Sequence, residues 1–296
     1  MRKKRLHGVR KGAAMIMRAV FIALVAAMLL VLLYGYFTNR LGVRYERNGT
    51  SVTFFNVGQG DSALFLTEDA AILFDAGPFG EADDTVMSIK MRTDKLDCIV
   101  ISHPHEDHMG ALAAVLGSVK TDRIIMTSDS SEGVFFTRAL DVIERKGIPV
   151  TEAKAGDEYV FGDVRLEFFS PTEYTDDKNE NSAVVRASAG DFSVLFTGDA
   201  SKETEKGIIE RYGDRLRSDV LKVGHHGSSA STSAEFLAAV SPRAAVISCG
   251  LGNSYSHPHA STLNRLTDCG AQIFRTDLDG EITVRIEDGK LNVTKR

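Results

Sequence analysis

Seven of the eight histidines in this sequence fall in three short clusters, and the densest cluster has the residue types of a metal site. It reads HPHEDH and follows the largely apolar run of residues 96–102. His103 and His105 are two residues apart, so in an extended backbone both side chains can point to one side and bind one ion. Asp107 and His108 follow where the chain turns towards a predicted helix, and they can reach a second ion. Imidazole and carboxylate ligands suit zinc, with manganese or iron as alternatives.

Three further segments carry the other candidate residues, and each has a simpler structural explanation. Asp199 follows the apolar run LFTG and precedes a predicted helix, so by itself it would be an N-cap. His225 and His226 follow the run LKVG, while His257 and His259 lie in a loop, where single histidines are usually surface residues. A solvated polar turn would likewise explain any one residue of HPHEDH. Because seven histidines gather in such segments, we favour one shared metal site.

Short apolar segments separated by turn signals place these residues after predicted strands. The predicted strands are residues 51–57, 63–67, 71–74, 96–102, 123–126, 164–169, 183–187, 193–196, 220–223 and 244–248. The predicted helices are residues 109–116, 135–146, 202–212, 234–240 and 261–269. Early hairpins followed by strand–helix alternation predict a layered α/β domain with polar residues at the strand ends.

The N-terminal residues have the composition of a membrane anchor. Residues 1–18 include seven Lys or Arg, and residues 19–37 form an uncharged apolar run. A helix of this length approaches the roughly 30 Å of a bilayer core. A cleavable signal peptide also begins with basic residues, but this run is long and ends without a small-residue cleavage pattern. We predict a basic cytoplasmic tail (1–18), a transmembrane signal anchor (19–37), a linker (38–49) and a domain (50–296) outside a bacterial cytoplasmic membrane.

The charge balance differs between the two parts of the chain. The first 47 residues contain ten basic and one acidic residue, so the rest carries 25 basic and 39 acidic residues, a formal net charge of −14. Proteins that bind nucleic acid by neutralising phosphates usually have a basic face. The acidic balance therefore counts against a long polyanionic substrate, although metals or a local patch could attract a phosphate. The cysteines, Cys98, Cys249 and Cys269, show no CxxC spacing. Cys249 and Cys269 could pair in an oxidising environment, and we favour free thiols.

The ordered motifs resemble the metallo-β-lactamase superfamily and, within it, the hydrolase domain of ComEC-type DNA-internalisation competence proteins. The motifs are HxHxDH (103–108), FNVGQGDS (55–62), LFDAG (73–77), FTGD (196–199), VGHHGS (223–228) and HPH (257–259). The resemblance covers about residues 50–290. It implies a metal-dependent hydrolase with an αββα sandwich fold and its metals at one edge of the two sheets.

The resemblance also implies a set of ligands for two divalent ions, with zinc preferred and manganese as the alternative. The implied metal ligands are His103, His105, Asp107, His108, Asp199 and His226. Asp199 would bridge the two ions. One histidine of the pair His225/His226 would complete the second ion's ligands; the glycine that follows favours His226, and the reverse order stays open.

Other motif residues would support the ligands or face the substrate. Asp75 would orient the histidine loop, with Asp61 and Asn181 as further supporting residues. The candidate catalytic residues are Asp107, His225, His257 and His259. A histidine beside the metals can protonate a leaving group or donate a hydrogen bond to a substrate oxygen. Many superfamily members have a further histidine ligand where this chain has Asn-Glu-Asn-Ser at 179–182, so the first ion is expected to keep an open position.

The favoured function is a membrane-anchored phosphodiesterase or nuclease acting outside the membrane, with DNA as a candidate substrate. Two divalent ions lower the pKa of a shared water and neutralise charge on phosphoryl oxygens. A phosphodiesterase directed at phosphorylcholine or the cell envelope is the alternative, and a non-catalytic metal-binding sensor is a further one. The competence proteins also carry a channel of several membrane spans, of which this sequence shows no counterpart, so DNA uptake itself is not predicted. No motif identifies a protein partner.

Overall fold

The chain divides into two units, residues 1–46 and 47–296. The computed structural model describes residues 17–18, 20–30, 49–287 and 289–296, and of the first unit the described residues are helical. Among the residues described, no helix has both the length and the apolar character needed to cross a membrane. Most of the predicted linker and the remainder of the predicted anchor lie outside the described residues.

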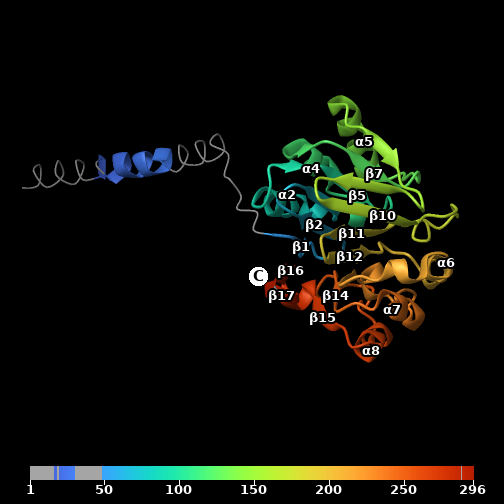
Figure 1. Cartoon of the computed structure of the whole chain (residues 1–296). Helices are drawn as coiled ribbons and strands as arrows, with labels where there is room; N and C mark the ends of the chain where they lie inside the picture. The colour runs from blue at the N-terminus through green and yellow to red at the C-terminus, as the bar shows by residue number, and fades with distance from the viewer. Residues whose placement is uncertain (1–16, 19, 31–48, 288) are drawn as a thin grey trace, which may run out of the picture. The chain divides into compact units, whose positions relative to one another are not determined.

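The unit 47–296 contains two large β-sheets (Figure 1). The eight-stranded sheet has the order β17 (Lys290–Lys295), β16 (Ile282–Glu287), β1 (Ser51–Phe54), β2 (Ser62–Leu66), β3 (Ala71–Ala76), β5 (Cys98–Ile101), β7 (Ile124–Met126) and β8 (Val150–Glu152). The seven-stranded sheet has the order β15 (Gln272–Arg275), β14 (Ala244–Ile247), β13 (Val220–Lys222), β12 (Phe192–Phe196), β11 (Val184–Ala189), β10 (Val164–Ser170) and β9 (Glu158–Phe161). A small separate pair consists of β4 (Lys95–Leu96) and β6 (Lys120–Thr121).

Helices cover the outer face of each sheet, as Figure 1 shows. The first sheet carries α2 (Ala82–Lys90), α4 (Leu112–Ser118) and α5 (Val134–Lys146), and the second carries α6 (Lys202–Tyr212), α7 (Ala234–Val240) and α8 (Ala260–Asp268). Shorter helical turns are η1 (Phe79–Glu81), α3 (Glu106–Met109), η2 (Gly213–Leu216), η3 (Gly224–Gly227) and α9 (Thr276–Asp279). This order of helix, sheet, sheet and helix confirms the predicted αββα sandwich.

The central core lies between the two sheets. Phe54, Phe65 and Phe74 of the first sheet are buried in the same cluster as Phe192 and Phe196 of the second. The Phe74 and Phe196 rings stack with 3.8 Å between their centroids. Two further apolar clusters fill the spaces between each sheet and its helices. Both faces of the central strands are therefore buried, which explains why their sequences are almost continuously apolar.

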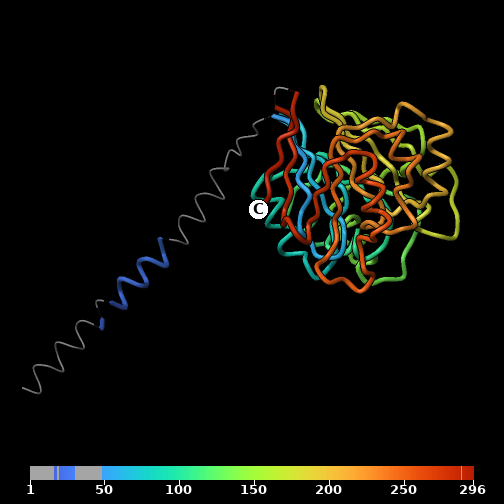
Figure 2. Tube along the Cα trace, turned by 90° about the horizontal axis from the view of Figure 1, so that it is seen from below, coloured from blue at the N-terminus to red at the C-terminus, as the bar shows by residue number. Residues whose placement is uncertain are grey.

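The last hairpin of the chain completes the first sheet. β16 pairs with β1 in antiparallel register, with Ser51 opposite Arg285. Figure 2 shows the blue β1 and the red C-terminal strands running side by side. These C-terminal strands were absent from the strands predicted from sequence, because their alternating polar residues give a weaker apolar signal than the buried strands do.

Most other predicted elements lie close to their predicted positions, and α6 and α7 have the predicted bounds. Each of these helices begins at a serine whose hydroxyl accepts a backbone hydrogen bond, Ser201 and Ser233 respectively. The helix predicted at 109–116 differs. Helical structure already begins at Glu106 with α3 and resumes with α4, so the last two candidate ligands of HPHEDH lie in a helical turn.

Candidate metal centre

The carboxyl ends of several strands bring the candidate residues to one edge of the sandwich. β3 and β5 are parallel, and so are β12, β13 and β14. The carboxyl ends of parallel strands lie at the same edge, where the loops that follow them meet. The loop after β5 carries HPHEDH, the loop after β12 carries Asp199, and the loop after β13 carries His225 and His226.

Asp75, at the end of β3, contacts the histidine loop at Ser102 and His108. Its carboxylate accepts hydrogen bonds from the Ser102 backbone N at 2.7 Å and from the Ser102 hydroxyl at 2.8 Å. The same carboxylate lies 2.9 Å from Nδ1 of His108. This contact leaves Nε2 of His108 to face Asp199, whose Oδ1 is 3.3 Å away. Burial raises the pKa of Asp75, and His108 opposes that change.

His103 and His105 point the same way, as their spacing predicted. Nε2 of His103 lies 2.9 Å from Nδ1 of His105 and 3.9 Å from Oδ2 of Asp199. The other nitrogen of His103 is 3.0 Å from the Ser102 hydroxyl and 3.4 Å from that of Ser182. Those hydroxyls fix the buried His103 ring, whereas His105 is only partly buried and lines the cleft in front of the site.

Gly198 allows Asp199 of the second sheet to approach the histidine loop of the first. Its φ of +49° is a left-handed conformation that glycine adopts without strain. A Cβ atom at this position would lie 2.7 Å from Cβ of Ser102. The backbone N of Asp199 donates a hydrogen bond to the Ser182 hydroxyl at 3.1 Å. Asp199 is thereby held, 3% exposed, between the two sheets.

His226 is the buried member of the His225/His226 pair. Its Nε2 lies 3.2 Å from Oδ2 of Asp107 and 3.8 Å from Oδ1 of Asp199. His225 is more exposed, and its Nε2 lies 3.6 Å from Oδ2 of Asp199. Both residues have positive φ angles, and their rings are inclined to each other by 78°. The geometry therefore agrees with His226 as the ligand and His225 as a residue facing the cleft.

The residues at this edge fit divalent metal ions. Groups whose ligand atoms lie within 4.8 Å of one another are His103/His108/Asp199, Asp107/His108/His226, Asp61/Asp199/His226 and Asp61/Asp75/His108. Oδ1 of Asp199 and Nε2 of His108 are buried without a hydrogen-bond partner in the described part of the chain. Buried polar atoms normally have partners, so these two atoms are suited to a bound ion. His105 is absent from the groups found among the described residues.

The electrostatics of the cluster also favour cations. Burial alone would lower the pKa of His226, but the carboxylates of Asp199 and Asp61 raise it to about 10. His108 shows the same balance, and its pKa lies well above the usual value. Burial would raise the pKa of Asp199, yet His108 and His226 hold it well below its usual value. Carboxylates that attract protons onto neighbouring imidazoles would attract metal ions in the same way.

The predicted HPH histidines have different surroundings. His257 lines the cleft, and burial together with the nearby His226 and His225 lowers its pKa to about 4. It is therefore neutral at pH 7 and better suited to donating a hydrogen bond than to protonating a leaving group. His259 accepts a hydrogen bond at Nδ1 from the backbone N of Ser229 at 2.8 Å. This contact ties the HPH loop to the loop that carries His226.

Asn181 does not contact the predicted ligands. Its side-chain amide accepts a hydrogen bond from the Thr175 backbone N at 2.8 Å and donates one to the Thr175 carbonyl at 2.9 Å. It therefore closes the loop before β11, and the supporting role expected from the resemblance belongs to its neighbour Ser182. The reason is local, because a fully buried amide finds its partners in the turn that buries it.

Sequence reasoning missed several residues that support the site. Ser102, Ser182 and Ser248 contact candidate ligand histidines through a hydroxyl or carbonyl oxygen, and serines are too common for the sequence to single them out. Lys222 also escaped notice. Its position in the sequence could have indicated a role, because a lysine at the end of the apolar strand β13 is unexpected unless its charge has a buried partner.

A cleft of about 600 Å³ lies in front of these residues. It is lined by Gln59, Pro104, His105, Glu106, Asp107, Ser131, Phe135, Asn179, Asp199, His225, His226, Tyr255 and His257. Tyr255 is 64% exposed, and its ring stacks on His257 with 5.6 Å between centroids. The cleft therefore joins the metal-binding groups to an aromatic rim.

Residues 55–251 match the family model of the metallo-β-lactamase superfamily. The chain belongs to this superfamily. Its members are mostly metal-dependent hydrolases, and the fold typically binds divalent metals such as zinc. The structure resembles the metallo-β-lactamase fold protein YhfI from Bacillus subtilis, with a TM-score of 0.54 and 12% identity over 83% of this chain and all of that chain. At that identity the likeness supports the fold alone.

Curated relatives at higher identity are ComEC-type competence proteins. Competence protein ComA of Neisseria gonorrhoeae is 33% identical over 255 residues, which cover 85% of this chain and 34% of that protein. ComE operon protein 3 of Bacillus subtilis is 33% identical over 196 residues, which cover 66% of this chain and 25% of that protein. The chain thus spans a quarter to a third of the length of these relatives, and the resemblance to their hydrolase domain is confirmed.

A buried glutamate holds the loop that follows His225 and His226. Glu205 of α6 is 1% exposed, and its carboxylate accepts hydrogen bonds from the backbone N atoms of Thr232 and Ser233. Arg265 of α8 donates to the carbonyl of Thr232 at 2.7 Å. The loop is therefore fixed from two helices, which also fixes the backbone that aims His226.

Glu205 predicts a pH dependence of stability. Burial raises its pKa from 4.5 to about 6, against the opposing hydrogen bonds from Ser233 and Thr232. The pKa of Glu205 is higher in the folded state than in the unfolded state. Its contribution to the free energy of unfolding is therefore fully present below pH 4.5 and is lost as the pH rises through 6. Relative to Glu205→Gln, the free energy of unfolding of the wild type should fall by about 2 kcal/mol across that window. Urea unfolding between pH 4 and 7 measures the difference.

The matched control is Glu210→Gln, an exposed position on the same helix. This control should keep the pH profile of the wild type. Parallel profiles for the wild type and Glu205→Gln would contradict the assignment.

Proposed function

We propose that this chain is a phosphodiesterase that uses two divalent metal ions, of which zinc is the preferred candidate. The observation that carries the proposal is the cluster that loops of both sheets form beside one cleft, made of His103, His108, Asp199, Asp107 and His226. Imidazole and carboxylate side chains in such a group are the ligands of hydrolytic zinc sites. The membership of the metallo-β-lactamase superfamily supports hydrolysis as the reaction class.

Each ligand has a distinct place in this proposal. Asp199 takes part in a group with His103 and in another with His226, so it is the residue suited to bridging two ions. His103 and His105 would hold the first ion, and Asp107 with His226 would hold the second. His108 lies between the groups. When bound, such ions supply Lewis acidity that activates water and neutralises charge on substrate oxygens.

Residues of the cleft would bind and orient the substrate. His257, neutral at pH 7, would donate a hydrogen bond to a non-bridging phosphoryl oxygen. His225 is a second candidate for the same task, since it faces the cleft beside Asp199. The exposed ring of Tyr255 could stack on a planar group next to the scissile bond. This rim and the competence-protein relatives support a nucleotide phosphodiester, with DNA as the candidate polymer.

A second candidate is a phosphodiesterase for a small or cell-envelope substrate such as a phosphorylcholine ester. The formal net charge of −14 after residue 47 favours it, because an acidic domain repels a long polyanion. We further propose that residues 19–37 anchor the chain and place residues 50–296 outside a bacterial cytoplasmic membrane. Recovery of the full chain in the soluble fraction of lysed cells would contradict the anchor.

A panel of three substrates tests the function. The full chain, purified and loaded with Zn²⁺, would be assayed with bis-p-nitrophenyl phosphate, single-stranded DNA and p-nitrophenyl phosphorylcholine. Turnover of the first two is expected. Turnover of the first substrate without DNA would argue against a nuclease, and a preference for the phosphorylcholine ester would favour the second candidate. Bound zinc without turnover of any substrate would overturn the enzyme and favour a metal-binding sensor.

A further inference from the structure

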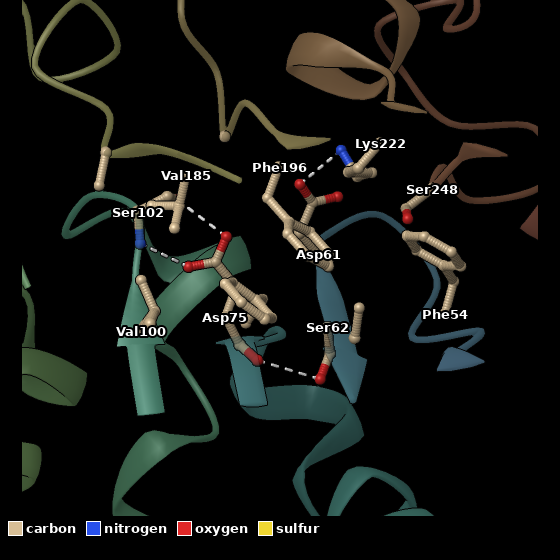
Figure 3. Close-up of a pocket in the computed structure, with 14 residues that line it drawn as sticks. Phe54, Asp61, Ser62, Asp75, Val100, Ser102, Val185, Phe196, Lys222 and Ser248 are labelled. Carbon is tan, nitrogen blue, oxygen red and sulfur yellow. Dashed lines mark hydrogen bonds and ion pairs between the residues drawn. The ribbon is translucent and has the colours of Figure 1, made fainter. Parts of the chain in front are cut away.

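An ion pair is buried directly behind the candidate metal centre. Asp61, at the end of the loop between β1 and β2, is 4% exposed, and Lys222, at the end of β13, is 3% exposed. Nζ of Lys222 lies 2.6 Å from Oδ2 of Asp61. Figure 3 shows the two side chains pointing at each other from opposite sheets, with Ser248 beside them. The pair therefore joins the two sheets at the edge that carries the site.

Stability of the sandwich does not explain this pair. Removing two charges from water is costly, and replacement of a buried ion pair by apolar side chains is often neutral or stabilising. The neighbours of Lys222 in β13, Val220 and Leu221, are buried and apolar, so an apolar residue at position 222 would suit the strand. A function at the adjacent site is the better explanation.

The Asp61 carboxylate lies directly behind the His226 ring. Its Oδ1 lies 3.3 Å from Nδ1 of His226, and the Ser248 carbonyl lies 3.0 Å from the same nitrogen. The hydrogen bond of this nitrogen to the Ser248 carbonyl and the adjacent Asp61 charge favour a proton on Nδ1, so Nε2 is the nitrogen whose lone pair a metal ion can take in place of a proton. That Nε2 faces Asp107 at 3.2 Å. The acceptors behind the ring thus present Nε2 to the metal-binding group.

Lys222 holds Asp61 in this position. The Asp61 oxygens belong to groups with Asp199 and His226 and with Asp75 and His108, so they lie near enough to become metal ligands themselves. A cavity of about 20 Å³ lies beside the carboxylate. Lys222 binds Oδ2, and its Nζ is itself fixed by a hydrogen bond to the Val223 carbonyl at 2.8 Å.

We propose that Lys222 is a positioning residue that holds the Asp61 carboxylate against His226, aims Nε2 of His226 at the metals and keeps Asp61 out of their ligand set. The proposal rests on the metal site proposed above. Lys222 acts through Asp61, so the two residues form one functional unit. Replacing either Lys222 or Asp61 alone should weaken metal binding. Replacing the other residue as well should weaken it little further.

A double-mutant cycle in the full chain tests this coupling. The variants are Lys222→Met, Asp61→Asn and the double variant, and the main measurement is zinc affinity by competition with a chromophoric chelator. The loss of a residue that orients a metal ligand typically lowers metal affinity about 10–100-fold. We expect a loss in that range for Asp61→Asn and a similar loss for the double variant. The absorption bands of the Co²⁺-loaded protein should change in both, because the ligand geometry at His226 changes.

The double variant keeps the test decisive if Lys222→Met alone leaves an unpaired charge and fails to fold. Its urea unfolding midpoint should match or exceed that of the wild type. Wild-type zinc affinity and Co²⁺ bands in a folded double variant would overturn the proposal. Additive losses for the two single changes would also overturn it, since Lys222 would then act independently of Asp61.

The matched control is the pair Arg186–Glu167, whose Nη1 and Oε2 atoms are 2.9 Å apart on β11 and β10 of the second sheet. The variant Arg186→Met/Glu167→Gln should leave zinc affinity unchanged. A wild-type chain that binds no zinc would contradict the proposed function. Zinc binding that is equal in the wild type and in the Lys222 and Asp61 variants would contradict only this inference.

Discussion

Replacement of Asp107 by alanine is expected to lower the hydrolysis of bis-p-nitrophenyl phosphate by at least about 100-fold and to leave the fold intact. The loss should exceed the roughly 10–100-fold cost of removing a partner of a metal ligand, because Asp107 is proposed as a ligand itself. Its Oδ2 lies 3.2 Å from Nε2 of His226 and 3.9 Å from Nε2 of His108. Its side chain is 31% exposed, and it belongs to none of the apolar clusters.

Steady-state kinetics, circular dichroism and metal content of the purified variant check this expectation. Asp107→Asn should lose as much activity as Asp107→Ala, because a neutral amide keeps the shape but is a poor metal ligand. Asp141→Ala, at an exposed position on α5, is the control that should keep full activity. Wild-type turnover in Asp107→Ala would remove this residue from the site.

Local sequence patterns predicted the parts of the site that lie within a few residues of one another. The spacing of His103 and His105 gave two side chains on one side of an extended loop, and the structure places their nitrogens 2.9 Å apart. The bounds of α6 and α7 also agree with the predicted ranges, and each helix begins after a serine whose hydroxyl accepts a backbone hydrogen bond. Such features are set by the nearest neighbours in the chain, so they can be read without knowing the fold.

Contacts between distant segments could not be predicted from spacing. Asp199 meets His108 across 91 residues, and its approach was implied by the resemblance of ordered motifs rather than by its own sequence. The hydroxyl of Ser182 reaches His103 across 79 residues, and nothing in the run Asn-Glu-Asn-Ser distinguishes it from its neighbour Asn181. The choice depends on how the two sheets are offset, which is a property of the packed sandwich.

The pairing of β16 with β1 illustrates the same limit for the fold. It joins residues near position 51 to residues near position 285. Strand pairing of this kind depends on the register of whole sheets, while the half-exposed C-terminal hairpin lacks the continuous apolar runs of the core strands. The core strands were therefore predicted and the last hairpin was missed.

Asp199 should control metal binding itself, and Asp199→Asn is the variant that separates this role from folding. The asparagine keeps the size of the side chain and can still occupy the space between His103, His108 and His226. It removes the charge that raises the pKa of both buried histidines, His108 and His226. We expect the full chain of this variant to bind at least one zinc ion fewer than the wild type and to lose hydrolysis by at least about 100-fold.

The clearest readout is the effect of zinc on thermal unfolding. A ligand that binds only the folded state stabilises it by about 2.7 kcal/mol when its free concentration is 100 times its Kd. Zinc should therefore raise the Tm of the wild type by several degrees and raise that of Asp199→Asn much less. Because Asp199→Asn removes the charge that balances the buried His108 and His226, its unfolding temperature without zinc is expected to fall, and the zinc-induced shift is therefore measured within each protein. Equal zinc-induced shifts in both proteins would show that the ions bind elsewhere, because no other carboxylate among the described residues joins the His103 and His226 groups.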